Sequence, residues 1–198
     1  MNTTEKGNAF EQQVYKALKE ELNAERLGLL PHSCEIFRKR SYFSKDRGSN
    51  IVADISIEVT LPNANRWSFL WVWECKDHKR ALSVGEVEEF DSKLRQIAGD
   101  NIKGALAVSG GLQSAAFDYA CSKGIGVVRI LPKQQIQWIL YQEEGLLITE
   151  RALNSTDFSN AITNPDYIST GEDFYAVADG YMYSDWCSLV CQTIEAAV

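Results

Sequence analysis

The sequence predicts an α/β fold, in which a mixed β-sheet is flanked by helices on both faces. Patterns typical of helices and strands follow one another in the order helix, antiparallel strands, helix, strand, helix, strand. This alternation is expected of a central sheet with covering helices. In addition, residues 67–73 (WSFLWVW) are apolar at nearly every position. Because the side chains of a strand alternate between its two faces, this run predicts a central strand that is covered on both sides.

The size and composition of the chain disfavour several classes of protein. Its 198 residues are enough for one well-filled core. It has no run of about 18 to 20 apolar residues that would span a bilayer, and its first residues do not resemble a signal peptide. We therefore expect a cytoplasmic protein that does not bind membranes. The 5 scattered cysteines predict reduced thiols, and the 2 histidines disfavour a site built from clustered histidines.

Charge is distributed unevenly along the chain, whose formal net charge is −7. Residues 1–110 carry 16 Lys and Arg against 16 Asp and Glu, whereas residues 111–198 carry 4 against 11. The net charge does not indicate nucleic-acid binding. The first part nevertheless holds basic groups that can contact phosphates, and the acidic second part is a candidate surface for a protein partner.

The first predicted element is a helix over residues 7–30. Its apolar side chains recur every four residues, as expected for one face of a helix: Phe10, Val14, Leu18 and Leu22. Glu11 lies beside this apolar stripe. It can be a solvated glutamate of the first turn, where it suits the helix dipole, or a carboxylate that reaches a site on the sheet. The sequence alone favours the first interpretation.

Two strands separated by a polar turn follow this helix. Residues 35–43 predict the first strand, and residues 51–60 predict the second, with regular alternation of apolar and polar side chains. We expect the second strand to present two faces, one with Ala53, Ile55, Ile57 and Val59 and the other with Asp54, Ser56 and Glu58. Glu58 is expected to contact solvent, with metal ligation as the less favoured alternative. A turn at residues 61–66 leads into the tryptophan-rich strand, so these two strands should be antiparallel neighbours.

Helices and strands alternate in the next part of the chain. Ser83 and Glu86 match a capping box for a helix that runs to about residue 98. A strand at residues 103–109, a helix, and a strand at residues 126–131 then predict a right-handed parallel crossover.

We assign residues 1–150 to one domain, which ends with a helix opened by Pro132 and a strand at residues 145–149. Residues 151–198 are a C-terminal extension of unassigned role, packed on the core or leading into a further domain. Within this extension, residues 174–183 predict a short hairpin, and Ser184 can cap a terminal helix.

Three charged residues in the strands stand out as a candidate site. Glu74 and Lys76 end the tryptophan-rich strand and, being two residues apart, project from the same face. Asp54 lies in the preceding strand, and the register of the two strands decides whether it lies beside them. A salt bridge at a sheet edge is the alternative interpretation of Glu74 and Lys76. The tryptophans themselves are expected to pack in the core rather than to stack on bases.

This pattern resembles the PD-(D/E)XK nuclease superfamily, in which an Asp precedes an (Asp/Glu)-X-Lys motif on adjacent strands of a restriction-endonuclease-like sheet. The matching residues are Asp54 and the run Glu74-Cys75-Lys76. The helix GNAFEQQVYKAL and the segment ALAVSGGLQSAAFDYACSKGIGVVRI are similar to parts of Mrr-like restriction endonucleases. The resemblance covers residues 7–131. It departs from many Mrr-like members, which have Gln in place of Glu74, and from the motif's Pro, which is Ala53 here.

The resemblance implies Mg²⁺-dependent hydrolysis of DNA phosphodiester bonds by an endonuclease of the restriction, defence or DNA-repair type. Asp54, Glu74 and the backbone carbonyl of Cys75 would hold Mg²⁺, for which Mn²⁺ should substitute. Lys76 would orient the attacking water or stabilise the phosphate. Glu11 would bind a second metal or steer a water.

Basic residues near these positions are candidate DNA contacts: Arg38, Lys39, Arg40, Lys45, Arg47, His78, Lys79 and Arg80. Cleavage of both strands would require a homodimer. Two alternatives to the enzyme remain: a catalytically silent nuclease-fold module that binds nucleic acid or protein, and an interaction or sensory domain that binds a partner through the acidic C-terminal part. The intact set of Asp54, Glu74 and Lys76 favours the enzyme.

Overall fold

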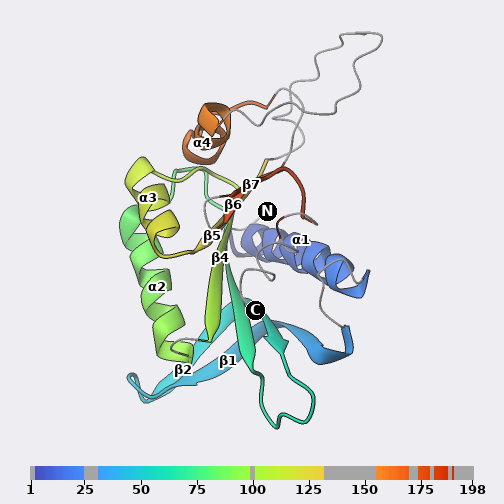
Figure 1. Ribbon diagram of the computed structural model, residues 1–198. Coiled ribbons are helices and arrows are strands. Elements are labelled where there is room, and N and C mark those ends of the chain that lie inside the picture. Colours follow the sequence, from blue (N-terminus) through green and yellow to red (C-terminus); the bar gives the residue numbers. More distant parts are fainter. Residues whose placement is uncertain are drawn as a thin grey trace.

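The described residues form a seven-stranded sheet in which the strands lie side by side in their sequence order (Figure 1). The structure, a computed structural model, describes residues 3–24, 31–98, 101–131, 155–169, 174–178, 181–186 and 189. The strands are β1 (Cys34–Ser44), β2 (Ser49–Val59), β3 (Phe69–Lys76), β4 (Ile102–Val108), β5 (Gly126–Ile130), β6 (Phe174–Ala178) and β7 (Tyr181–Tyr183). The α-helices are α1 (Thr3–Asn23), α2 (Val84–Ala98), α3 (Ser114–Ser122) and α4 (Ser155–Thr163).

The directions of the strands make the sheet mixed. β1, β2 and β3 pair in antiparallel fashion, whereas β3, β4 and β5 pair in parallel. β6 and β7 are antiparallel to their neighbours. α3 connects the parallel strands β4 and β5, as the predicted strand–helix–strand unit requires. The predicted mixed α/β sheet is therefore confirmed.

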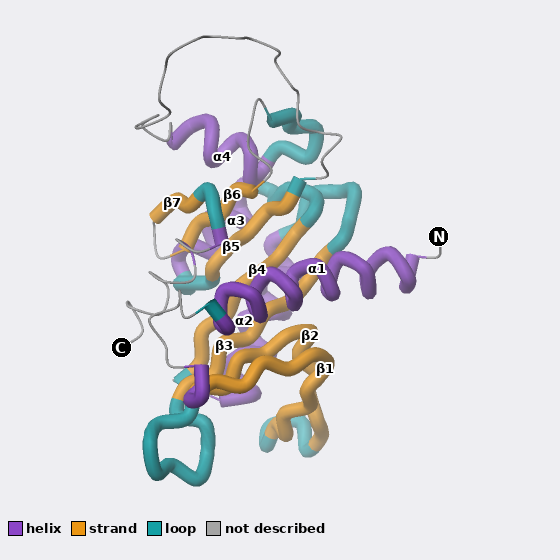
Figure 2. The backbone as a smooth tube through the Cα atoms, turned by 90° about the vertical axis from the view of Figure 1, so that its right-hand side faces the viewer, coloured by secondary structure: helices purple, strands orange, loops and turns teal. Residues whose placement is uncertain are grey.

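Helices cover both faces of the sheet. α1 lies against one face through its predicted apolar stripe, Phe10, Val14, Leu18 and Leu22. α2, α3 and α4 lie on the other face and contribute side chains such as Phe90, Ala116 and Phe158. In Figure 2, α1 crosses in front of the strands and α2 lies behind them. We call the two apolar clusters the α1 core and the α2 core.

β3 is buried on both of its faces. Trp71 and Trp73 point into the α1 core, whereas Leu70 and Val72 point into the α2 core. Each of these side chains is at most 2% exposed. The centroids of the two indole rings lie 4.9 Å apart. Burial of such large apolar groups stabilises the centre of the sheet, and it confirms core packing for these two tryptophans.

β1 and β2 turn over at Lys39 and at the residue opposite to it, so that the strand face directed at the α1 core on one side of this point is directed at the α2 core on the other side. On β1, Ile36 packs against the α1 core and Tyr42 packs in the α2 core, although both positions are even-numbered. On β2, Ile55 packs in the α1 core, whereas Ala53 packs in the α2 core. Lys39 has a φ of 51°, a left-handed conformation that interrupts the alternation of a strand. The prediction that Ala53 shares a face with Ile55 is wrong, because β2 is paired with β1 on both sides of Lys39 and turns over with it.

The C-terminal strands extend the same sheet. β6 pairs with β5 and β7 pairs with β6, so the predicted hairpin is confirmed. The sequence pattern did not indicate α4, which is held by the fully buried Arg129 of β5. The Arg129 guanidinium donates hydrogen bonds to the carbonyls of Ala161, Asn164 (2.5 Å) and Pro165 (3.3 Å). A cation at this position satisfies carbonyls at the C-terminal end of a helix.

Several predicted elements lie wholly or mostly outside the described residues. They are the continuation of the first helix over residues 25–30, the helix from Pro132, the strand at residues 145–149 and the terminal helix after Ser184. The domain boundary after residue 150 lies there as well and stays a prediction. Among the helices that the structure describes, none combines the length and the apolar character needed to cross a membrane.

Candidate active site

An opening between β2 and β3 defines the candidate site. The pairing of these strands ends at Ile55↔Trp73, and the next positions in the same register are Asp54 and Glu74. Beyond this point β3 continues beside β4 as far as Lys76. The two strands are antiparallel neighbours, as predicted, and their register brings Asp54 to the Glu74-Cys75-Lys76 motif.

The carboxylate of Asp54 lies in this opening. Its Oδ2 accepts a hydrogen bond of 2.9 Å from the backbone N–H of Cys75. The side chain thus replaces the backbone of β2 as the acceptor for this amide, which satisfies a polar group that is otherwise expensive to leave unpaired. The bond fixes Asp54 against the backbone between Glu74 and Lys76.

Glu11 reaches the same place from α1. It is 3% exposed, so the interpretation as a solvated glutamate is wrong. α1 begins at Thr3, which places Glu11 in its third turn rather than its first. One oxygen, Oε1, lies 3.0 Å from Arg38 Nε, and the other, Oε2, lies 2.6 Å from Lys39 Nζ. These two cations allow a carboxylate to be buried here.

The Lys39 ammonium joins two carboxylates. Its Nζ lies 2.6 Å from Glu11 Oε2 and 2.5 Å from Asp54 Oδ1. Lys39 and Asp54 occupy facing positions of β1 and β2, with a ladder pair on either side. Burial lowers the pKa of Lys39, but its hydrogen bonds to Asp54 and Glu11 and the charges of both carboxylates outweigh this effect and raise the pKa above its ordinary value. Lys39 is therefore a permanent cation of the site at neutral pH.

Glu74 and Lys76 project from the same face of β3, as predicted. Lys76 Nζ lies 2.8 Å from Glu74 Oε1, and Lys93 of α2 brings a second ammonium to within 3.1 Å of the same oxygen. The Glu74 side chain is 8% exposed. Among the described residues, no hydrogen bond reaches its other oxygen, Oε2.

The pKa of Lys76 is raised above its ordinary value. Burial of the ammonium lowers this pKa, but the charge of Glu74 and the hydrogen bond to it raise the pKa by more, with further contributions from the charges of Asp54 and Glu89. Asp54 and Lys76 therefore belong to one electrostatic site. At neutral pH Lys76 is charged and can donate hydrogen bonds to an anion.

Three groups of the site were predicted to bind Mg²⁺. Asp54, Glu74 and the Cys75 carbonyl offer hard oxygen ligands. In the part of the chain that the structure describes, however, no three His, Cys, Asp or Glu side chains are grouped so that they could hold a metal ion. Ammonium groups occupy the cation positions instead, with Lys39 between Glu11 and Asp54. A divalent cation bound by these oxygens would have to join the ammonium groups or displace them.

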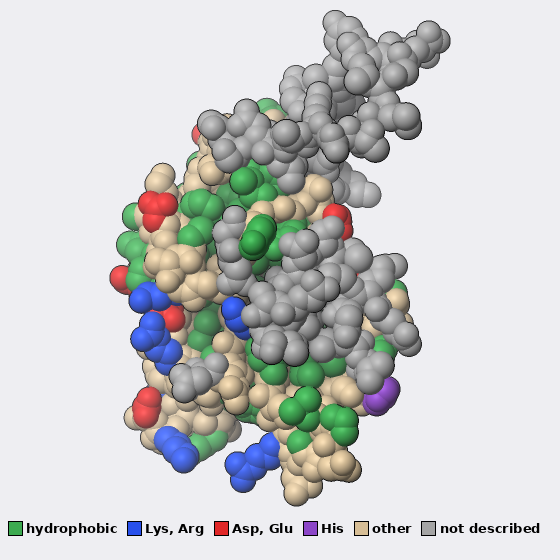
Figure 3. All heavy atoms as spheres, viewed as in Figure 1, with side chains coloured by type: hydrophobic (Ala, Val, Ile, Leu, Met, Phe, Trp, Pro, Cys, Tyr) green, Lys and Arg blue, Asp and Glu red, His purple; other side chains and the backbone are tan. Residues whose placement is uncertain are grey.

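The residues predicted to contact DNA differ in their surroundings. Half of them are ion-paired inside the chain: Arg38 and Lys39 with Glu11, Arg40 with Glu58, and Arg80 with Glu86. Lys45, Arg47, His78 and Lys79 are exposed, and so are the ion-paired Lys39, Arg40 and Arg80. On the face seen in Figure 3, Lys and Arg side chains form small separate groups among acidic and uncharged ones. This face lacks the broad basic surface typical of DNA-binding proteins among its described residues, and the DNA contacts stay predictions.

The loop that follows β3 packs beside the site. Asp77 accepts a hydrogen bond of 2.6 Å from Ser109 Oγ, at the end of β4. A Cβ atom at Gly110 would come within 2.5 Å of the carbonyl oxygen of His78 and 2.8 Å of that of Arg80. Glycine is therefore required for this close approach of two backbones. It holds the exposed residues 78 and 79 next to the end of β3.

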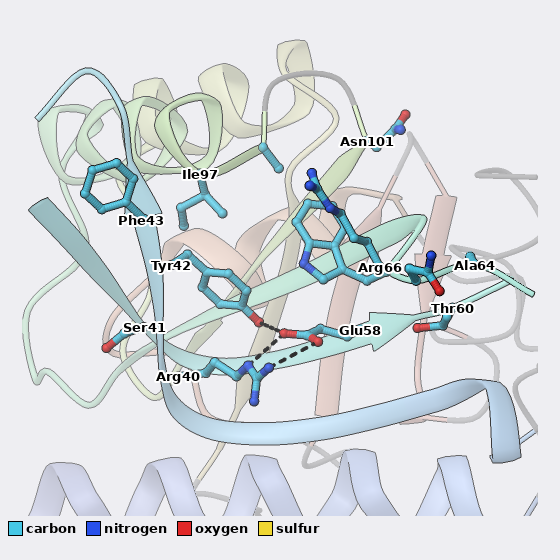
Figure 4. Close-up of a pocket in the computed structure, with 13 residues that line it drawn as sticks. Arg40, Ser41, Tyr42, Phe43, Glu58, Thr60, Ala64, Arg66, Ile97 and Asn101 are labelled. Carbon is cyan, nitrogen blue, oxygen red and sulfur yellow. Dashed lines mark hydrogen bonds and ion pairs between the residues drawn. The ribbon is translucent and has the colours of Figure 1, made fainter. Parts of the chain in front are cut away.

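A separate pocket of about 770 Å³ opens between β1, the loop after β2 and the end of α2 (Figure 4). Glu58 lines it and is 8% exposed, so the expected solvent contact of Glu58 is wrong. Its Oε1 accepts a hydrogen bond of 2.9 Å from the Tyr42 hydroxyl and lies 2.8 Å from Arg40 Nε. Burial is the main cause that raises the pKa of Tyr42. Glu58 thus has a structural partner on each side, which accounts for its burial without a metal.

Sequence reasoning did not find Lys93 and did not assign Lys39 to the carboxylates. Lys93 precedes Leu94 of the buried α2 stripe, and a position at the border of such a stripe can reach the neighbouring strand. That spacing is a usable signal. For Lys39 no comparable signal exists, because a left-handed lysine inside a strand is not indicated by any local pattern.

Comparisons with known proteins yield weak structural similarity. No protein-family model and no curated protein matches the chain. Matches among solved structures include a protein of unknown function, with a TM-score of 0.39 and 16% identity over 55% of this chain and 55% of that chain. They also include a repair endonuclease from Pyrococcus abyssi, with a TM-score of 0.38 and 14% identity over 61% of this chain and 47% of that chain. The chain thus spans about half the length of either protein. These TM-scores identify neither a family nor an activity.

Proposed function

We propose that this protein is a metal-dependent endonuclease that hydrolyses phosphodiester bonds of DNA, in restriction, defence or DNA repair. One observation carries the proposal. The Asp54 carboxylate accepts a hydrogen bond of 2.9 Å from the Cys75 amide and so lies against the Glu74-Cys75-Lys76 motif. The nuclease superfamily that the motif resembles has this Asp on the strand adjacent to the motif. The contact between Asp54 and the motif supports a nuclease more specifically than the short sequence motif does alone.

Asp54, Glu74 and the Cys75 carbonyl would hold Mg²⁺ or Mn²⁺. When bound, such an ion acts as a Lewis acid on the phosphate and lowers the pKa of a bound water. Lys76 would orient the attacking water, or donate hydrogen bonds to the phosphate oxygens as negative charge develops on them. In the hydrolysis, a bond forms between the water oxygen and phosphorus as the water gives a proton to solvent, the bond from phosphorus to the leaving sugar oxygen breaks, and that oxygen takes up a proton.

DNA is the substrate that the resemblance implies, and local contacts would have to bind it. The chain has a net charge of −7, so long-range attraction to DNA is weak. The exposed His78 and Lys79 follow the motif strand after Asp77, which supports a role in contacting phosphates next to the site. Cleavage of both DNA strands would require a homodimer, with one site for each strand.

Nicking of supercoiled plasmid DNA by the full chain tests this proposal. We expect open-circle product with Mg²⁺ or Mn²⁺, none with EDTA, and a decrease of about 100-fold or more in the rate for Lys76→Ala, as for the loss of a group that stabilises transition-state charge. Lack of cleavage by the wild type with both metals, or full activity of Lys76→Ala, would contradict the proposal.

A second candidate function is a catalytically silent module of the same fold that binds nucleic acid or protein. The observation in its favour is that ammonium groups already neutralise the carboxylates, Lys39 at Asp54 and both Lys76 and Lys93 at Glu74. A gel shift of DNA by wild-type protein that does not nick with either metal would favour this function over the enzyme.

A further inference from the structure

We infer that the Lys39 ammonium takes the place of a second metal ion, so that the site binds one divalent cation rather than two. This inference rests on the proposed function. The family resemblance would give Glu11 a second metal, yet the position between Glu11 and Asp54 is held by the Nζ atom of Lys39, at 2.6 Å and 2.5 Å from their oxygens.

The two carboxylates are fixed in position around this ammonium. The second oxygen of Glu11 lies 3.0 Å from Arg38 Nε, and the second oxygen of Asp54 accepts the hydrogen bond from the Cys75 amide. Each carboxylate therefore presents its remaining oxygen to Lys39 in a set direction. The Glu11 and Asp54 side chains are 4% and 20% exposed, so water competes little for these oxygens.

The backbone of β1 is shaped to bring this lysine to the site. Lys39 has a φ of 51°, a conformation that is unfavourable for a residue with a Cβ atom and persists where the surrounding structure holds it. β1 and β2 turn over at this point, as the packing of Ile36 and Tyr42 in different cores shows. A lysine in regular strand conformation would not have this placement, so strand geometry and charge act together here.

Electrostatics keep a second metal out of this position while leaving the first one possible. A divalent ion between Glu11 and Asp54 would meet two positive groups, Lys39, which contacts both carboxylates, and Arg38, which contacts Glu11. Glu74 differs, because its hydrogen bonds from Lys76 and Lys93 both fall on Oε1. Its Oε2 accepts no hydrogen bond from the described residues, and Oδ2 of Asp54 accepts one from the neutral Cys75 amide, so these two oxygens would bind the one metal.

Titration of the full chain with Mn²⁺, followed by electron paramagnetic resonance of the free ion, tests the inference without measuring cleavage. We expect one bound Mn²⁺ for the wild type and two for Lys39→Met, in which the ammonium is replaced by an apolar group of similar length. Lys93→Met is the matched control, since it also removes a lysine from a site carboxylate but not from the position between Glu11 and Asp54. It should still bind one.

Glu11→Gln gives a second test that does not depend on the folding of Lys39→Met. If Glu11 serves Lys39 rather than a metal, this variant should bind one Mn²⁺ with an affinity within about threefold of the wild type. Two Mn²⁺ ions in the wild type, one in a folded Lys39→Met, or the loss of an ion in Glu11→Gln would overturn the inference and leave the nuclease proposal intact. A wild type that binds no Mn²⁺ and does not nick DNA would overturn both.

Discussion

The Asp54 side chain and the Cys75 backbone are joined by a hydrogen bond of 2.9 Å at the point where β2 and β3 stop pairing. Each oxygen of this carboxylate has a different partner: Oδ2 accepts from the Cys75 amide, and Oδ1 contacts the Lys39 ammonium. The structural role of Asp54 and its proposed role in binding a metal can therefore be separated by substitution.

Asp54→Asn should fold and lose cleavage. The amide keeps an oxygen that can accept the Cys75 hydrogen bond, but it removes the negative charge that a metal requires. We expect plasmid nicking to fall about 100-fold or more, with a cooperative urea unfolding curve like that of the wild type. Asp54→Ala also removes the acceptor of this hydrogen bond. Its free energy of unfolding should therefore be lower than that of Asp54→Asn by about 1–3 kcal/mol, the usual cost of leaving a buried donor unpaired. Wild-type nicking by Asp54→Asn would contradict the assigned role.

Lys76 and Lys93 should differ in their effect on cleavage, although both contact Glu74 Oε1, at 2.8 Å and 3.1 Å. Lys76 belongs to the motif strand and is assigned to the phosphate, whereas Lys93 belongs to α2 and only balances the charge of Glu74. We expect Lys76→Met to abolish nicking and Lys93→Met to keep it within about tenfold of the wild type, since one ammonium remains at Glu74. Rate constants measured side by side at saturating Mg²⁺ decide this. Equal losses in the two variants would show that neutralising Glu74, rather than contacting the phosphate, is what matters.

The start of α2 should make stability depend on pH in the acidic range. A bidentate hydrogen bond from the Arg80 guanidinium, together with hydrogen bonds from Ser83, lowers the pKa of Glu86 from 4.5 to about 2. Burial acts in the opposite direction but is outweighed. A lowered pKa in the folded state means that the contribution to stability is complete above pH 4.5 and is lost as the pH falls towards 2. Glu86→Gln should be less stable by about 1 kcal/mol at pH 7, as for the loss of a helix cap.

The melting temperatures of the wild type and Glu86→Gln, measured from neutral to acidic pH, check this prediction. Their difference should shrink as the pH falls from 4.5 to about 2. A difference that stays constant over this interval would mean that the ionisation of Glu86 is not linked to folding.

Arg129 should be essential for holding α4 on the sheet. Its guanidinium donates to the carbonyls of Ala161, Asn164 and Pro165 from a fully buried position. Arg129→Met keeps much of the side-chain volume but leaves these carbonyls without their donor, which should lower the free energy of unfolding by about 2–3 kcal/mol. Arg95→Met, which removes an exposed arginine paired with Asp91, is the control and should leave the urea midpoint unchanged. Equal midpoints for both variants would refute this assignment.

The strands of the first 131 residues could be predicted to within two residues of their ends, because the spacing of apolar side chains reports which faces are buried. The run from Trp67 gave β3, and the alternation around Ile55 gave β2. α4 was missed because its pattern is short, with Phe158, Ala161 and Ile162 as its buried apolar positions. A stripe of three residues does not rise above chance in a polar segment.

The contacts inside the site were less predictable than the strands that carry it. Glu11 is buried by two cations that come from β1, Arg38 and Lys39, and a partner 27 residues away cannot be read from the helix itself. The turning over of β1 at Lys39 is a second obstacle, since it separates Ala53 from Ile55 and breaks the rule of alternation on which face assignments depend. Tertiary contacts overrode local preference at both places.

The sequential order of the strands has a consequence for the growing chain. Each strand of the described sheet is added next to the strand made before it, so no strand has to wait for, or be inserted between, later ones. The residues assigned to catalysis and their cationic partners all lie between Glu11 and Lys93. During synthesis from the N-terminus, β1 to β4 can therefore bring the charged groups together while the C-terminal half is still being made. Strands β5 to β7 then extend the opposite edge of the sheet, and Phe174, Ala176 and Tyr183 complete the α1 core beneath the charged groups.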